Sequence, residues 1–380
     1  MRKSPFQKIP KKCRKIPSKH YYIMKKNYFK CQFFIKKAFI YKYNMEENMA
    51  SVYIVSEIGK IKKSNENLIF ENKDGETKRI MPDQTDLLVL NNHVSVTGES
   101  LTLLARNSIP VYFLQNGSIP NITLDFGNSK NGFLRQKQYL ISSDNHKTLN
   151  IAKSIVKGKI KNQLVFMNRL NRADTRNDLI LPVTKFKVLI KKIDKCKTKD
   201  QLRGIEGTAS RLYFDLFDCH IIPDWAVFGK RSRQPPQTNV NAVMSYLYSL
   251  LAVRVQNALE AYGLDTMCSN LHEMTYGKTS LAYDLMEEFR TPIADTLCCR
   301  LFNHGVLKPD DFEERDGGVY MTVEGCQKVI QAFESKMRNE INSDKEEQRF
   351  SYLELIFNQA NKYKKFIMNE EESYVPFAMR

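Results

Sequence analysis

Three segments in the second half of this 380-residue chain concentrate side chains that can bind a metal ion or move a proton. Glu206 stands between two glycines, which let backbone or substrate approach a carboxylate closely. His272 lies in a polar stretch between two helical patterns. Asp284 and Glu287 are three residues apart in the next helical pattern, so both carboxylates project from one face. Each feature alone also fits a structural role, as a first-turn glutamate, a surface histidine or a solvated acidic pair.

Together these side chains form a mixed carboxylate and imidazole set that suits Mg²⁺ or Mn²⁺. Such an ion polarises a scissile phosphate and stabilises the departing oxygen, so the set predicts phosphodiester chemistry. A rival hypothesis makes Tyr213, seven residues after Glu206, a covalent nucleophile. Its apolar neighbours Leu212 and Phe214 favour a packing role instead.

The first half of the chain has the pattern of a small, mainly β domain. Short apolar or alternating runs rich in β-branched residues are typical of strands, and Asn116-Gly117 predicts a tight turn. A polar stretch at 127–132 predicts a linker. We expect strands at 52–55, 67–70, 86–90, 93–96 and 109–114, with a helix at 100–107.

Beyond residue 133 the apolar period becomes helical. Lys153, Lys157 and Lys161 form a row on one face of the first long helix, where they would line phosphate or simply be solvated. The predicted class is α+β, with a small N-terminal mainly-β domain followed by a larger all-α catalytic domain. We expect helices at 147–171, 241–262 and 279–301 and from residues 323 and 345, and domain boundaries of 1–48 (basic leader), 49–127 (β-rich), 128–135 (linker), 136–370 (helical) and 371–380 (tail).

The net charge of +17 is unevenly distributed. Fourteen of the 59 Lys and Arg lie in residues 1–44, which contain no acid, so the rest of the chain is nearly neutral. That leader lacks the apolar stretch of a secretory signal and is interpreted as a flexible basic extension or as a start placed ahead of Met45 or Met49. No apolar run is long enough for a membrane span, and the eight cysteines form no C-x-x-C pair, so we expect a cytoplasmic protein without membrane contact.

Five ordered motifs across residues 50–340 resemble the CRISPR-associated integrase family Cas1. The resemblance is carried by the glycine-flanked glutamate, the histidine loop, the acidic helix, an arginine and proline run, and a lysine-rich motif upstream. The motifs are Lys157-Gly-Lys-Ile-Lys-Asn162-Gln163, Gly204-Ile-Glu206-Gly207, Arg231-Ser-Arg233-Gln-Pro235-Pro236 leading to 241–245, Gly263-Leu-Asp followed by Leu271-His272-Glu273, and Ser280–Arg290.

The resemblance implies a metal-dependent DNA endonuclease and integrase that inserts foreign DNA as new spacers into a CRISPR array by 3′-hydroxyl attack. By position, Glu206, His272 and Glu287 correspond to the metal ligands, with Mg²⁺ or Mn²⁺ as cofactor, and Asp284 to a companion acid needed for catalysis. Glu288 stays open as a substitute for Glu287. The implied partners are double-stranded DNA, a second copy bound through the β domain, and the small second adaptation protein of CRISPR systems.

Duplex DNA requires local cations, because the body of the chain is nearly neutral. Two alternatives remain: a DNA-repair nuclease with the same metal chemistry, and a non-catalytic DNA-binding scaffold. The candidate DNA contacts are Lys230, Arg231, Arg233, Lys278 and Arg290.

Overall fold

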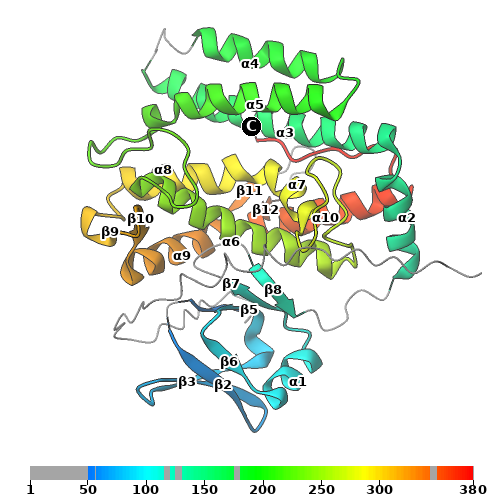
Figure 1. Cartoon of the computed structure of the whole chain (residues 1–380). Coiled ribbons are helices and arrows are strands. Elements are labelled where there is room, and N and C mark those ends of the chain that lie inside the picture. Colours follow the sequence, from blue (N-terminus) through cyan, green and yellow to red (C-terminus); the bar gives the residue numbers. More distant parts are fainter. Residues whose placement is uncertain are drawn as a thin grey trace, which may run out of the picture. The chain divides into compact units, whose positions relative to one another are not determined.

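The computed structural model describes residues 50–55, 57–114, 120–124, 131–174, 180–342 and 349–379 (Figure 1). All of them fall within one compact unit of the chain, Lys37–Arg380. The leader and the Asn116-Gly117 turn lie outside the described residues. No helix in the described part is both long and apolar enough to cross a bilayer.

The first half contains two four-stranded sheets (Figure 1). One has the order β1-β5-β7-β8, with β1, β5 and β7 parallel and β8 antiparallel to β7. The other has the order β4-β3-β2-β6. The bounds are β1 Ala50–Ile54, β2 Gly59–Ser64, β3 Asn67–Asn72, β4 Thr77–Ile80, β5 Thr85–Asn91, β6 Val94–Val96, α1 Gly98–Arg106, β7 Val111–Leu114 and β8 Pro120–Leu124.

The parallel strands are buried on both faces, which explains their continuous apolar runs. Leu88 and Leu90 of β5 join Phe70 of β3 in a core between the two sheets. Leu87 and Val89 point the other way, into the core of the helical half. The β domain is therefore packed directly onto the helices that carry the candidate site.

The second half is built around α6, whose side chains are buried along most of its length. Thr198 and Thr238 begin α5 and α6 by accepting hydrogen bonds from the backbone N–H groups of Gln201 and Asn241. The bounds are α2 Gly132–Ser142, α3 Asn145–Asp174, α4 Ile180–Ile193, α5 Lys199–Asp215, α6 Asn239–Ala261, α7 Ser280–Phe289, α8 Thr296–Asn303, β9 Phe312–Arg315, β10 Gly318–Met321, α9 Val323–Arg338, β11 Glu340–Asn342, β12 Arg349–Ser351 and α10 Tyr352–Ile367.

The predicted class, a mainly-β first part followed by a mostly helical second part, is confirmed. The second part is not purely helical, because β9 pairs with β10 and β11 with β12. The helix expected at 279–301 is divided by a π-helical turn at Arg290–Asp295, which contains Pro292, a residue without a backbone N–H. Helix α2 begins at Gly132, inside the range expected as a linker.

Candidate metal and phosphodiester site

Asp284 and Glu287 lie on one face of α7, as their spacing predicts, but they face different partners. The Asp284 carboxylate is fully buried. Its Oδ2 accepts hydrogen bonds from the backbone N–H groups of Asn270 (2.6 Å) and Leu271 (2.9 Å). Its Oδ1 accepts from the backbone N–H of His272 (3.0 Å). One carboxylate thus shapes the loop that carries the histidine.

The same carboxylate also orients the His272 ring. Nδ1 lies 2.7 Å from Asp284 Oδ1, and an ionised carboxylate only accepts, so Nδ1 carries the proton. In the neutral ring Nε2 then keeps its lone pair free for a ligand. Nε2 lies 3.8 Å from Glu287 Oε1.

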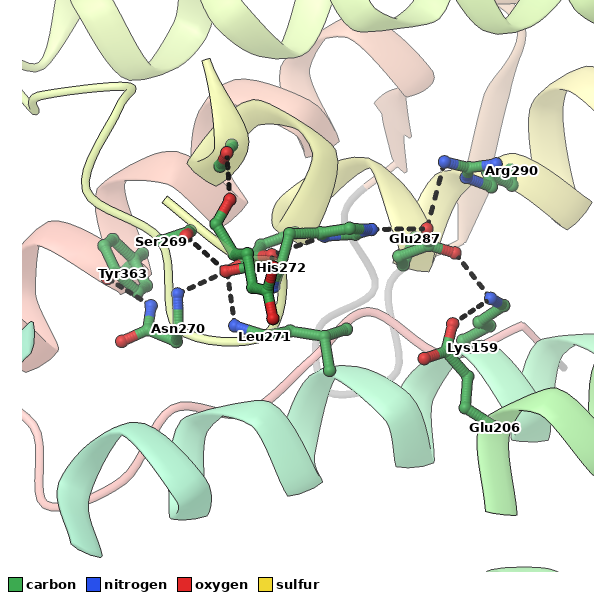
Figure 2. A network of polar contacts seen from close by, with 12 residues as sticks. Lys159, Glu206, Ser269, Asn270, Leu271, His272, Glu287, Arg290 and Tyr363 are labelled. Carbon is green, nitrogen blue, oxygen red and sulfur yellow. Dashed lines mark hydrogen bonds and ion pairs between the residues drawn. The ribbon is translucent and has the colours of Figure 1, made fainter. Parts of the chain in front are cut away.

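Lys159 of α3 joins the two glutamates (Figure 2). Its Nζ lies 2.6 Å from Glu206 Oε1 and 2.9 Å from Glu287 Oε2. Burial disfavours the charged ammonium, but the two carboxylates outweigh it and raise the pKa of Lys159. Glu206, on α5, and Glu287, on α7, therefore share one cation although 81 positions separate them in the chain.

Glu287 is held ionised by a second cation. Arg290 Nη2 lies 3.0 Å from Glu287 Oε1. Burial alone would raise the pKa of this carboxyl, but Arg290 and Lys159 lower it below its usual value. A charged, almost fully buried carboxylate faces the space between α3, α5 and α7.

Glu206, Glu287 and His272 provide the kinds of ligand atom that a divalent cation requires. Two carboxylates and one imidazole nitrogen suit Mg²⁺ or Mn²⁺. Glu287 Oε2 is buried and accepts no well-aligned hydrogen bond, because Lys159 meets it only as an ion pair. In the described part of the chain, however, no three His, Cys, Asp or Glu side chains form a ready metal-binding group. The Lys159 ammonium lies between the two carboxylates, so a metal ion bound by both would have to displace it.

Glu288, left open as a substitute ligand, points away from these groups. Its Oε1 accepts a hydrogen bond from the Tyr374 hydroxyl (2.5 Å) and its Oε2 one from the Phe377 backbone N–H (2.8 Å). Burial raises its pKa to about 8. Glu287 is thus the acid of α7 that faces Lys159 and His272.

Of the five candidate DNA-binding cations, three are exposed to solvent and two are partly buried and held by other protein groups. Lys230, Arg233 and Lys278 are exposed. Arg231 is half-buried and donates to Asn241 Oδ1 (3.0 Å) and Ser245 Oγ (3.1 Å), and burial lowers its pKa. Arg290 stacks over the Tyr248 ring at 4.6 Å while it pairs with Glu287.

Lys159 is the site residue that the sequence patterns did not single out. The predicted lysine row lies on another face of α3, where Lys157 pairs with Asp194 at 2.9 Å and Lys153 donates to the Asp194 carbonyl. The available signal was a lysine within the apolar face formed by Val156 and Ile160. Burial of a lysine requires a charged partner, and that partner comes from distant segments.

Tyr213 is 1% exposed, and its hydroxyl donates to Asp295 Oδ2 at 2.8 Å. Burial, first, and the Asp295 charge raise the pKa of its hydroxyl well above the usual value. Both facts favour the packing role over the covalent one.

Solved structures share this architecture. A Cas1 protein from Thermotoga maritima superposes with a TM-score of 0.75 at 24% identity, covering 87% of this chain and 100% of that one. A casposase bound to its integration product gives a TM-score of 0.76 at 20% identity, covering 85% and 92%. At these identities the likeness establishes the fold.

Sequence comparison establishes the family. The model for CRISPR associated protein Cas1 matches residues 52–335. A CRISPR-associated endonuclease Cas1 of Thermus thermophilus is 33% identical over 295 residues, 78% of this chain and 86% of the relative. Another, of Thermodesulfovibrio yellowstonii, is 28% identical over 329 residues, 86% and 98% of the two chains. This chain belongs to the Cas1 family, as its motifs indicate.

Proposed function

We propose that this protein is a divalent-metal-dependent DNA endonuclease and integrase that inserts foreign DNA fragments as new spacers into a CRISPR array. The endonuclease names of its relatives support the nuclease chemistry. The observation that carries the metal dependence is the arrangement of Glu206 and Glu287, which share one cation beside an imidazole nitrogen.

Glu206, Glu287 and Nε2 of His272 would hold the ion, Mg²⁺ or Mn²⁺. When bound, the ion would supply a Lewis acid for the scissile phosphate and for the departing oxygen. Asp284 acts through His272, because it fixes the proton on Nδ1 and leaves Nε2 as the donor. Asp284 is therefore a positioning residue in this proposal, since both its oxygens are engaged and buried.

The nucleophile comes from outside the protein. In joining it is a DNA 3′-hydroxyl, and in hydrolysis it is water, so no covalent Ser, Cys or Tyr is required. The buried Tyr213 hydroxyl supports this choice, because it is held by Asp295 and is out of contact with solvent.

Cations around the site are proposed to hold DNA phosphates. Lys278 follows the His272 loop and is exposed. Lys192 and Lys195 line a shallow hollow between α4 and α5 together with Gly204 and Thr208, close to Glu206 in the chain. Cβ atoms at Gly204 and Gly207 would meet nothing within 4 Å, so this face of α5 stays open.

The proposed assembly follows from the family. Solved relatives include a Cas6-RT-Cas1–Cas2 complex, in which the matching part has a TM-score of 0.76 at 23% identity and covers 90% of this chain and 37% of that one. We propose that this chain likewise binds double-stranded DNA and the small second adaptation protein, pairs with a second copy through its β domain, and works in the cytoplasm.

Strand transfer tests the proposal. A short duplex is offered to a supercoiled array plasmid with Mn²⁺, Mg²⁺ or chelator, using native protein, Glu206→Gln and His272→Ala. We expect joining to require metal and to fall by at least about 100-fold in both variants, because each loses a metal ligand. Glu99→Gln, an exposed change on α1, is the matched control and should join as the native protein does.

The outcomes separate the alternatives. Unaltered joining by both variants contradicts the site. Metal-dependent cutting without any joining favours a repair nuclease. DNA binding that is insensitive to chelator, with neither cutting nor joining, favours a scaffold.

A further inference from the structure

The segment after α10, residues 373–379, lies against the helices that carry the candidate site. Figure 1 draws it as a red coil running beside α3. It has no helical or sheet structure, yet Tyr374 is 2% exposed. A buried aromatic in an irregular segment indicates a specific docking surface, because its backbone must find partners outside regular structure.

On α7 the segment is held by the two residues that follow Glu287. Glu288 accepts hydrogen bonds from the Tyr374 hydroxyl (2.5 Å) and from the Phe377 backbone N–H (2.8 Å). The Phe377 ring stacks on Phe289, with centroids 5.2 Å apart and planes 13° apart. The docked segment thereby restrains the end of α7 that presents Glu287.

On α3 the segment is held by the residues around Lys159. Asn162 donates to the carbonyl oxygens of Phe377 (3.1 Å) and Glu288 (2.8 Å) and accepts from the Met379 backbone N–H (2.7 Å). A Cβ at Gly158 would lie 2.7 Å from Pro376 Cβ, so the close approach requires glycine. One amide side chain therefore ties α3, α7 and the segment together.

The segment also reaches the histidine loop. The Tyr374 ring packs edge-on against Tyr363, with centroids 5.5 Å apart. The Tyr363 hydroxyl accepts a hydrogen bond from Asn270 Nδ2 at 2.7 Å (Figure 2). The backbone N–H of Asn270 donates to Asp284. Tyr374 is thus linked through Tyr363 and Asn270 to Asp284, the group that orients His272.

We propose that residues 373–379 are a positioning element of the metal site, with Glu288 and Asn162 as its positioning residues. The segment touches two of the elements that supply the site, α3 with Lys159 and α7 with Glu287. It reaches the loop with His272 through Tyr363 of α10. It holds them at the spacing at which Glu287 and His272 serve one ion. This inference rests on the proposed metal-dependent function and assigns Glu288 a role apart from metal binding.

Two full-length variants test this role, one with a change in the segment and one with a change in α3. Tyr374→Phe removes the hydroxyl that Glu288 accepts and keeps the ring. Gly158→Ala pushes Pro376 away and leaves every segment residue unchanged. Hydrogen–deuterium exchange follows the backbone amides of residues 270–272, titration with Mn²⁺ alone gives metal affinity, and strand transfer gives kcat and KM.

We expect both variants to exchange the 270–272 amides faster, to bind Mn²⁺ about tenfold more weakly, and to lose kcat with little change in KM. Val375→Ala alters an exposed side chain of the same segment, and Gly98→Ala adds a Cβ in open space on α1. Both controls should match the native protein. Native exchange and native Mn²⁺ affinity in both test variants would overturn the proposal.

The exchange measurement keeps the two proposals apart. If native protein neither binds Mn²⁺ nor joins DNA, the proposed function fails, while faster exchange at 270–272 in both variants still supports the positioning role. If native protein is active and exchange is unchanged in the variants, the segment only covers the helices.

Discussion

At the scale of single residues, the ammonium group of Lys159 occupies the space between the two carboxylates that the metal proposal requires. An ammonium and a divalent cation compete for the same oxygens, because both are cations that carboxylates stabilise. Lys159 therefore offsets one of the two carboxylate charges in the structure, and it would have to move aside for an ion to bind.

Lys159→Met tests this competition. We expect Mn²⁺ to bind the variant about tenfold more tightly, because no ammonium has to be displaced. Isothermal titration with Mn²⁺ measures the affinity. Lys157→Met, which removes a lysine of the same helix from its pair with Asp194, serves as control and should bind as the native protein does. A tenfold weaker affinity in Lys159→Met would show that the lysine supports the ion instead.

Lys336 of α9 gives a pH-dependent prediction away from the site. Burial, first, and the charges of Arg169 and Arg300 lower its pKa to about 8. Below pH 8 Lys336 is charged in the folded protein, and the whole free-energy cost of burying that charge lowers stability. Between about pH 8 and the unfolded-state value near 10.5 only the unfolded chain keeps the proton, so stability rises with pH across that window.

Lys336→Met should therefore be more stable than the native protein by about 1 kcal/mol at pH 7, a figure reduced for partial solvent exposure. That advantage should shrink towards pH 10. Urea unfolding at both pH values measures it, with the exposed Lys365→Met as control. An advantage equal at the two pH values would contradict the assigned pKa.

At the scale of elements, the loop between α6 and α7 is organised by one carboxylate of α7. Three consecutive backbone N–H groups, those of residues 270–272, converge on Asp284. A buried carboxylate with this many donors resists rearrangement, because each unpaired N–H would cost free energy. The histidine is therefore positioned by α7 even though it lies in a loop.

Asp284→Asn should loosen this loop. Its Nδ2 cannot accept the hydrogen bonds that a carboxylate oxygen accepts, so at least one N–H loses its partner. We expect faster hydrogen exchange at 270–272 and strand transfer lower by about 10- to 100-fold, with KM nearly unchanged. Asp194→Asn removes an exposed carboxylate and should leave hydrogen exchange at 270–272 and strand transfer unchanged. Native exchange in Asp284→Asn would contradict the positioning role.

At the scale of the whole described unit, a buried network joins the β domain to the helices. Arg254 of α6 is 1% exposed and lies 2.7 Å from Glu334 Oε1 of α9. Tyr53 of β1 donates to the same oxygen at 2.6 Å, and Asp86 of β5 lies 3.5 Å from the guanidinium. These contacts fix the β1-β5 edge against α6 and α9.

Glu334→Gln should destabilise the protein by about 3 kcal/mol, because it leaves the buried guanidinium with Asp86, a partly exposed carboxylate 3.5 Å away, as its counter-charge. Urea unfolding followed by circular dichroism measures the change. Glu313→Gln breaks an exposed pair with Arg315 and should cost less than about 1 kcal/mol. A loss of that small size in Glu334→Gln would mean that the network contributes little.

The order of a β-rich part and a helical part could be predicted from local patterns, because periods of two and 3.6 residues are properties of consecutive residues. Glu206, His272, Asp284 and Glu287 could be proposed from residue type and spacing, and the family from motif order. The β9–β10 and β11–β12 pairs could not, because strands of three or four residues are too short to show a periodic pattern.

Tertiary structure decided which charges meet. Glu288 stands next to Glu287 in the chain, yet helical rotation sends one to Tyr374 and the other to Lys159. Lys159 joins Glu206 across 47 positions, and Asn162 joins Phe377 across 215. Ion pairs and hydrogen bonds depend on distances of about 3 Å, which chain folding sets and local spacing does not.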